Sequence, residues 1–509
     1  GETKTVTFDA TELDGSATVD ETFTLTGTAA TGKLVATGGG GADTLLGGTL
    51  NDTLDGGAGA DAITGNEGAD SLTGGAGDDT FTMDTKAEFT SAVGNDTVDG
   101  GAGTDTLALA VSMNLSAAQL ANVSNVELIT IPDGSEITIS DAVLTNNPGV
   151  SFTYAGAGTL TTGEDSLGAS LMSEALNVRS TANGDLKLVG SSSADTFTFA
   201  AVGTLTAADT IDGNAGTDII KIDNDSNGAV TDGVGNATSA AVGTSVSGVE
   251  EILIVDRGLD NDAGDVTLTI ASGITMTSLK VDATALDAKT NDPAATGEKL
   301  TLTNSDDTAL TALGGGFADE ITSGAGADRI EGNGGADTLK GGGGSDTILG
   351  GAGADVIWGE AGVDSIDGGA GNDTIDIRNL SEFQLSAGVE TINGGAGTDT
   401  LDFSEDTTTT ITAPELAQLY SIEKITLTNG DNAATLTFGN ATFTNNALDG
   451  NLQITTGTGT GATTIDGSAV SNGAFTIVVD NTAANANESL VGGSGDDIFR
   501  FKDTDELTV

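Results

Sequence analysis

Aspartates recur in this sequence at intervals of nine residues. Each lies in a frame of the form G-G-x-G-x-D-x-U-x, in which U is an apolar residue. The two long series are Asp43, Asp52, Asp61, Asp70 and Asp79, and Asp319, Asp328, Asp337, Asp346, Asp355, Asp364 and Asp373. Shorter or degenerate copies contain Asp96, Asp105, Asp209, Asp218, Asp399 and Asp497. A flexible Gly/Asp-rich linker would not keep this phase together with its apolar residue, so the pattern predicts an ordered repeat.

Each repeat divides into a turn and a strand. Glycine reaches positive φ at little cost, so the glycine-rich half is expected to turn the chain. The D-x-U-x half is expected to form a short strand that points its apolar residue, such as Leu45, inward. Two repeats, or eighteen residues, would complete one coil of an all-β parallel β-roll or β-solenoid. Asp43 and Asp61 would then stack on one edge, and Asp52 and Asp70 on the other.

The stacking of carboxylates predicts a bound metal. Neighbouring strands lie about 4.8 Å apart, so unpaired carboxylates on successive coils would repel one another. Ca²⁺ accepts roughly six to eight oxygen ligands, including backbone carbonyls, and would turn this repulsion into binding. One apolar residue in each nonapeptide makes a thin core, so folding is expected to be coupled to metal binding. About one ion for each stacked pair of loops gives more than about ten Ca²⁺ ions per chain.

Composition excludes several classes of function. The chain has 509 residues, a net charge of −60 and only 16 Lys and Arg, so phosphate backbones and anionic membranes would be repelled. We therefore expect no nucleic-acid partner, and the lack of a long apolar run predicts no membrane insertion. With no His and no Cys, His-based triads and His-ligated zinc are ruled out. Carboxylate-pair glycosidase chemistry stays open, but one Trp and two Tyr leave few platforms for sugars, so no enzymatic activity is expected.

The repeats form blocks separated by β segments. Alternating apolar and Thr residues, as in 266–270, favour strands in those segments, which would be calcium-poor β-solenoid or β-sandwich. An element with Glu127, Glu250 or Glu423 follows each block. Short helices are expected at 117–121 and 414–419. The predicted β segments are 1–37, 109–189, 224–313 and 404–484, and the predicted blocks are 38–108, 190–223 (degenerate), 314–403 and 485–509, a fourth block that the sequence truncates.

Glutamates are weaker candidates for metal ligands. Glu88 follows Asp79 by nine residues and would stack with Asp70, replacing Asp in a degenerate repeat. Glu382 would stack with Asp364 in the same way. The alternative is a structural Glu that duplication has copied. The glutamate candidates are Glu88, Glu382, Glu390, Glu488 and Glu506.

The nonapeptides resemble those of the repeats-in-toxin (RTX) family of secreted bacterial proteins. In that family, carbonyls at the second and fourth positions of one loop bind Ca²⁺ with carbonyls at the first and third positions of the next loop and both aspartates. The resemblance implies one site at Gly39, Gly41, Asp43, Gly56, Ala58 and Asp61, and another at Gly48, Leu50, Asp52, Gly65, Glu67 and Asp70. Leu50 departs from Gly at the fourth position, which is expected to weaken that site. The equivalent positions elsewhere are Gly57, Gly59, Gly74, Ala76, Gly332, Gly334, Gly335, Gly341, Gly342, Gly344, Gly350, Gly351, Ala352, Gly353, Gly359, Ala361, Gly368 and Ala370.

The alternation of such blocks with Thr/Ala/Val-rich β segments is similar to RTX surface-layer proteins of Gram-negative bacteria. This similarity implies type I secretion, folding in external calcium and an extracellular, cell-surface location. The leading hypothesis is a structural protein that self-assembles into an S-layer or filament, with room for a polysaccharide anchor outside the sequence given. One alternative is the stalk of a large RTX adhesin. Another is an RTX-containing enzyme that modifies polysaccharides.

Overall fold

The computed structural model divides the chain into two units. The first comprises Gly1–Ser226, Val242–Ile252 and Ile274–Met276, and the second comprises Asn227–Ala241, Leu253–Gly273 and Thr277–Val509. The described residues are 5–9, 22–27, 32–85, 88, 95–112, 114–115, 117–132, 135–138, 141–154, 165–168, 177–180, 186–199, 205–223, 238–255, 265–274, 278–286, 299–378, 390–404, 409–427, 434–440, 442, 451–456, 463–471, 476–481, 489–494 and 496–501.

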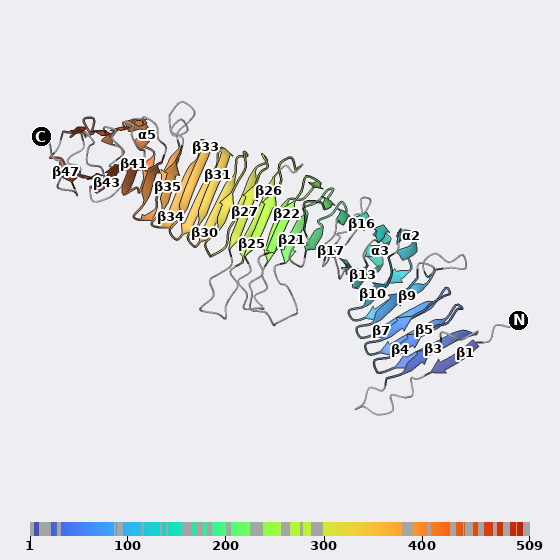
Figure 1. The fold of residues 1–509 in the computed structure, drawn as a ribbon. Coiled ribbons are helices and arrows are strands. Elements are labelled where there is room, and N and C mark those ends of the chain that lie inside the picture. Colours follow the sequence, from blue (N-terminus) through green and yellow to red (C-terminus); the bar gives the residue numbers. More distant parts are fainter. Residues whose placement is uncertain are drawn as a thin grey trace. The chain divides into compact units, whose positions relative to one another are not determined.

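The first unit consists of three ladders of parallel strands, and Figure 1 shows successive strands of the first ladder side by side. The first ladder contains β1 (Thr5–Asp9), β3 (Lys33–Gly39), β5 (Thr53–Ala58), β7 (Ser71–Ala76), β9 (Thr97–Ala102) and β12 (Val123–Ser124). The second contains β2 (Thr24–Thr26), β4 (Thr44–Leu46), β6 (Ala62–Thr64), β8 (Thr80–Met83), β10 (Thr106–Leu109), β13 (Leu128–Ile131), β15 (Ser151–Tyr154), β17 (Asn177–Ser180), β19 (Thr196–Phe199) and β21 (Ile219–Asp223). The third contains β11 (Asn114–Leu115), β14 (Glu136–Thr138), β16 (Asp165–Gly168), β18 (Leu186–Val189), β20 (Thr210–Asp212) and β23 (Val246–Ser247).

The second unit repeats this construction. Its longest ladder contains β25 (Val266–Ile270), β27 (Leu300–Asn304), β29 (Glu320–Thr322), β31 (Thr338–Gly344), β33 (Val356–Gly362), β35 (Thr374–Ile377), β38 (Thr400–Phe403), β41 (Lys424–Leu427), β43 (Asn451–Thr456), β45 (Thr476–Asn481) and β47 (Ile498–Phe501). A second contains β26 (Leu279–Ala285), β28 (Leu310–Leu313), β30 (Arg329–Gly334), β32 (Thr347–Ala352), β34 (Ser365–Gly371), β36 (Thr391–Asn393), β37 (Ala396–Gly397) and β40 (Leu419–Tyr420). A third contains β39 (Thr409–Ile411), β42 (Ala434–Thr437), β44 (Thr463–Asp466) and β46 (Ser489–Val491). Strands β22 (Thr238–Val242) and β24 (Glu251–Val255) contain residues of both units.

The strand register confirms the eighteen-residue coil. Ile348 on β32 lies opposite Ile330 on β30 and Ile366 on β34, and these side chains are buried. Leu339 and Ile357 are paired in the same way on β31 and β33. Each nonapeptide therefore adds one apolar side chain to a continuous inner column, as the sequence predicts.

Where the structure describes the β segments, their strands continue the same parallel ladders and form no sandwich. In the first unit β13 pairs with β15, and in the second β41 pairs with β43. The predicted short helices are present as α2 (Ala117–Leu120) and α5 (Ala413–Leu416), and α3 (Asp141–Asn146) is an additional helix that the sequence analysis missed. Within the described part of the chain, every helix is too short or too polar to cross a membrane.

The inner column predicts a position-specific effect on stability. Replacing Ile348 by Ala should lower the free energy of unfolding by about 2–5 kcal/mol, because a buried side chain is truncated between two packed neighbours. Replacing the adjacent Thr347, which is only partly buried, by Ala should cost under about 1 kcal/mol. Urea unfolding of the calcium-loaded protein measures both, and equal costs would contradict the inward orientation.

Candidate calcium sites

The aspartates of successive coils are joined by backbone hydrogen bonds. The N–H of Asp43 donates to Oδ1 of Asp61 at 2.7 Å, and the N–H of Asp337 donates to Oδ1 of Asp355 at 2.8 Å. The predicted stacking of aspartates eighteen residues apart is therefore confirmed. The rows joined in this way are Asp43, Asp61, Asp79 and Asp105; Asp52, Asp70 and Asp96; Asp195 and Asp218; Asp319, Asp337, Asp355, Asp373 and Asp399; and Asp328, Asp346 and Asp364.

The second carboxylate oxygen, Oδ2, has no hydrogen-bond partner in most of these residues. Thirteen such side chains are at most 2% exposed: Asp43, Asp61, Asp70, Asp79, Asp96, Asp105, Asp218, Asp337, Asp346, Asp355, Asp364, Asp373 and Asp399. A buried polar atom without a partner costs free energy, and a charged one costs more. Buried charges are tolerated when they are paired or coordinate a metal. This repeated orphan oxygen is therefore the structural mark of a cation site.

Glycine at the first position of most loops leaves room for two converging oxygens. A Cβ added to Gly332 would lie 2.3 Å from Oδ2 of Asp337 and 2.5 Å from the carbonyl oxygen of Gly350 on the next coil. At Gly56 the corresponding distances to Asp61 Oδ2 and the Gly74 oxygen are 2.2 and 2.7 Å. Any larger residue would fill this space, so the glycine keeps a carboxylate and a carbonyl from successive loops facing one cradle.

Glycines at the second and fourth positions bring further carbonyls between the loops. Gly351 and Gly353 have φ values of 112° and 142°. Their missing Cβ atoms would lie 2.1 Å from the Asn333 oxygen and 1.4 Å from the Gly335 oxygen of the preceding coil. Carboxylate and carbonyl oxygens are the donors that Ca²⁺ prefers, so the residues present fit this ion. The assignment of individual residues as calcium ligands, including the third-position carbonyl of Ala58, stays a prediction.

Burial and mutual repulsion raise the pKa of the stacked carboxyls. The pKa values of Asp70, Asp337 and Asp346 are raised to about 7, first by desolvation and then by the charges of neighbouring aspartates. The N–H group donated by the preceding aspartate opposes this rise. Five further pKa values are raised to about 6, those of Asp79, Asp96, Asp218, Asp364 and Asp373. Bound Ca²⁺ would supply the positive charge that lets these carboxylates stay ionised.

Some loops satisfy Oδ2 with their own backbone. In the Asp52 loop, the N–H of Gly48 donates to Oδ2 of Asp52 at 2.6 Å. The fourth position of this loop is Leu50, and neither Gly48 nor Leu50 has positive φ. Because residues with a Cβ avoid the left-handed region, the turn takes another shape and closes on its own aspartate. The prediction that Leu50 alters its site has this physical basis.

The same closure recurs in the first loop of each later block. The closing bonds are 2.5 Å from Ser191 to Asp195, 2.7 Å from Gly315 to Asp319 and 2.6 Å from Gly493 to Asp497. Position four is Ser193 in the Asp195 loop and Phe317 in the Asp319 loop. Two predicted ligands have their second oxygen bonded differently, since Asp328 accepts the Ser323 hydroxyl and Asp209 accepts the Thr206 N–H at 2.7 Å.

Three of these closed loops each accept a hydrogen bond from an asparagine side chain on the next coil. Asn66, Asn214 and Asn333 occupy the second position of the next loop, with φ between 62° and 69°. Their amide nitrogens donate to the carbonyls of Gly47, Gly190 and Gly314 at 2.9, 2.6 and 2.9 Å. The asparagine amide groups thus donate to first-position carbonyl oxygens, whose equivalents in the open loops would contact a cation. In the sequence, each of these loops has a residue other than glycine at position four, and the loop stacked on it has Asn at position two. This signal could have been found without the structure.

The structure corrects the predicted stacking of Glu88. The N–H of Asp70 donates to Oδ1 of Asp96 at 2.8 Å, and β9 pairs with β7, so Asp96 rather than Glu88 is the next member of the row. The two aspartates of this coil are 26 residues apart, so the coil contains about eight residues more than a regular eighteen-residue coil. Glu88 is buried, and burial and the charges of Asp84 and Asp96 raise its pKa to about 8.

In the third block, Glu390 occupies the position that Asp96 has in the first block. It immediately precedes Thr391, whose N–H donates to the carbonyl of Asp364 at 3.0 Å. The predicted stacking of Glu382 with Asp364, and the candidates Glu488 and Glu506, lie outside the described residues. Three glutamates for which the sequence predicted no ligand role also lie in these rows. The N–H groups of Asp105, Asp218 and Asp399 donate to Glu127, Glu250 and Glu423, respectively.

The raised pKa values predict a pH-dependent apo state. A raised folded-state pKa contributes stability that is complete below the ordinary value of 3.8 and is lost as pH rises through about 6 to 7. The metal-free protein should therefore show more strand by circular dichroism at acidic pH than at neutral pH. Calcium should restore the strand content at neutral pH, whereas a metal-free fold that does not change with pH would contradict this account.

The two kinds of loop predict unequal effects of neutral substitutions. Asp337→Asn should lower calcium affinity at least tenfold, because an orphaned carboxylate oxygen loses its charge. Asp319→Asn should have a smaller effect, because Oδ2 of Asp319 already accepts a backbone N–H. Calcium titration calorimetry compares the two variants, and equal losses would show that loop closure does not affect binding.

Comparison with known proteins agrees with the geometry. The family model described as RTX calcium-binding nonapeptide repeat (4 copies) matches residues 37–72, 46–81, 92–108, 205–225, 313–348, 340–375, 386–406 and 482–500. No curated protein matches the chain. The matched segments hold the stacked loops with orphaned carboxylates. This chain carries RTX calcium-binding nonapeptide repeats in multiple copies.

Proposed function

We propose that this chain is a secreted structural protein of the bacterial cell surface, a subunit of an S-layer or an extracellular filament. The observation that carries the proposal is the set of rows of buried carboxylates whose Oδ2 atoms have no partner inside a parallel solenoid. Proteins with RTX repeats are generally secreted, and calcium is available outside the cell. Calcium would then bind successive coils to one another inside each unit.

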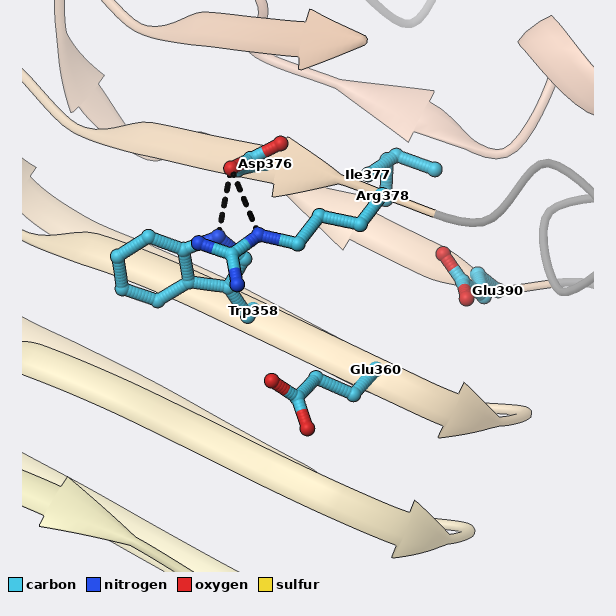
Figure 2. Close-up of a pocket in the computed structure, with 6 residues that line it drawn as sticks. All are labelled: Trp358, Glu360, Asp376, Ile377, Arg378 and Glu390. Atoms are coloured by element: carbon cyan, nitrogen blue, oxygen red, sulfur yellow. Dashed lines mark hydrogen bonds and ion pairs between the residues drawn. The ribbon is translucent and has the colours of Figure 1, made fainter. Parts of the chain in front are cut away.

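The surroundings of Trp358 favour a structural role over sugar binding. Trp358 is the last residue of a nonapeptide, and its indole N–H donates to Asp376 at 2.6 Å, as Figure 2 shows. The Arg378 guanidinium lies 4.7 Å from the ring centroid, and the Lys340 ammonium lies 5.2 Å from it. Cations on an aromatic ring stabilise it and occupy the surface that a sugar would stack on. The ring therefore ties neighbouring coils together.

The end rungs of the ladders favour assembly. Among the described residues, β1 pairs only with β3, and β47 pairs only with β45. Val6 and Phe8 on β1 are 41% and 38% exposed, and Ile498 on β47 is 45% exposed. An exposed strand edge with apolar side chains is a template for a further strand. Head-to-tail contacts of this kind give filaments or lattices when they do not close.

The second candidate function is the stalk of a large RTX adhesin. In that case further coils of the same polypeptide would cover the edges of β1 and β47. The two functions differ in whether a second copy of the chain supplies the next rung.

Electron microscopy at millimolar calcium tests the assembly. Filaments or sheets should form and should disperse when EGTA is added. Phe8→Lys together with Ile498→Lys should prevent assembly without changing the calcium content, because both side chains lie on end rungs. Particles that stay monomeric at millimolar calcium would contradict the proposal and favour the stalk.

A further inference from the structure

In each of the first three blocks, one row of stacked aspartates ends at a glutamate in the same arrangement. The N–H of Asp105 donates to Oε2 of Glu127 at 2.8 Å. The same bond joins Asp218 to Glu250 at 2.8 Å and Asp399 to Glu423 at 2.6 Å. In the nonapeptide rows this N–H is received by the aspartate of the next coil. The glutamate therefore takes the position of the next aspartate.

The backbone around the glutamate keeps one contact of a nonapeptide loop, the N–H that the following residue donates to the aspartate carbonyl, and adds a second from the glutamate itself. The carbonyl of Asp105 accepts N–H groups from Glu127 and Leu128 at 3.1 and 3.0 Å. The carbonyl of Asp399 accepts those of Glu423 and Lys424 at 3.1 and 2.9 Å. These pairs are separated in sequence by 22 and 24 residues, and the Asp218–Glu250 pair by 32. Connections of different length thus lead to one local geometry.

A backbone carbonyl also points into each of these positions. Asn125, Gly248 and Ser421, two residues before the glutamates, have φ values of 52°, 62° and 52°. A Cβ on Gly100 would lie 1.8 Å from the Asn125 oxygen and 2.6 Å from Oδ2 of Asp105. A Cβ on Gly213 would lie 2.0 Å from the Gly248 oxygen and 2.5 Å from Oδ2 of Asp218, and the Ser421 oxygen lies 2.2 Å from the equivalent point on Gly394. The convergence of a carboxylate and a carbonyl oxygen at the first-position glycine is therefore reproduced where the next coil is not a nonapeptide.

One oxygen in each cradle has no partner. Oδ2 of Asp105, Asp218 and Asp399 accepts no hydrogen bond, and these side chains are at most 1% exposed. The surrounding groups are the glutamate carboxylate and the carbonyl of the left-handed residue, both of which are acceptors. An acceptor-only set of oxygens around a buried carboxylate requires a cation or a proton.

We propose that each of these three positions binds a terminal Ca²⁺ ion. Its ligands would include the last aspartate of the block, the glutamate of the following element, and the carbonyl of Asn125, Gly248 or Ser421. Because the glutamate belongs to the following β segment, the ion fastens a calcium-poor segment to a calcium-rich block. This inference rests on the calcium binding of the nonapeptide loops proposed above.

The first block shows why the row stops at the glutamate. On the next coil, the side-chain oxygen of Asn147 accepts the N–H of Val126 at 2.9 Å, and its amide nitrogen donates to Val123 and Val143 carbonyls at 3.0 and 2.7 Å. Asn147 is fully buried. A neutral amide that brings its own donors leaves no orphaned oxygen for a further ion.

The test compares bound calcium in the full chain and in a variant with Glu127→Gln, Glu250→Gln and Glu423→Gln. Gln keeps an oxygen that accepts the aspartate N–H, so a purely structural acceptor role survives the substitution. Bound calcium is measured by elemental analysis after dialysis against buffered calcium, and circular dichroism reports folding. We expect the variant to lose about three ions, one for each substituted carboxylate.

The matched control replaces three outward-facing glutamates, Glu251, Glu320 and Glu331, by Gln, which makes the same change in net charge. Its calcium content should equal that of the unmodified chain. If the triple site variant does not fold, each single variant is measured and should lose one ion. A folded site variant with undiminished calcium would overturn the terminal sites alone. An unmodified chain that binds no calcium would overturn the proposed function as well.

Discussion

Repulsion between buried carboxylates on neighbouring coils is the constraint on which this structure depends. Parallel strands fix the separation of successive loops, and the N–H to Oδ1 bonds hold each aspartate in its row. The other oxygen is left facing carbonyls and other carboxylates in a nearly solvent-free space. Neutralisation by protons or by a divalent cation is then a condition of folding, and the cation has to replace the protons as pH rises through about 6 to 7.

The blocks have a direction that follows from this constraint. At the start of the third block, the closed loop of Asp319 is satisfied by its own Gly315 N–H and by Asn333 of the next loop, whereas in the first block the closed loop is that of Asp52, the second of the series. In the middle, open loops leave Oδ2 free for an ion. At the end, Glu423 takes the place of the next aspartate after Asp399. The β segment that follows has a core of buried apolar side chains.

The sequence predicted the parts of the fold that follow from its period. Nine residues place Asp43 and Asp61 on one edge and Leu45 in the core, and the structure confirms both. The nine-residue period could not predict the longer coil after β7, because it gives no information on how a longer loop closes. Glu88 was therefore predicted at the place that Asp96 occupies. The role of Glu127 was missed for a related reason. Its distance of 22 residues from Asp105 matches no multiple of the repeat, and only the folded ladder brings them together.

The number of calcium ions bound by the folded chain tests this account most directly. Native mass spectrometry or elemental analysis at saturating calcium gives that number. The thirteen aspartates with orphaned oxygens predict more than about ten tightly held ions, which are released together as the chain expands on chelation. A compact, neutral-pH chain that holds no calcium would show that the carboxylates are satisfied without a metal.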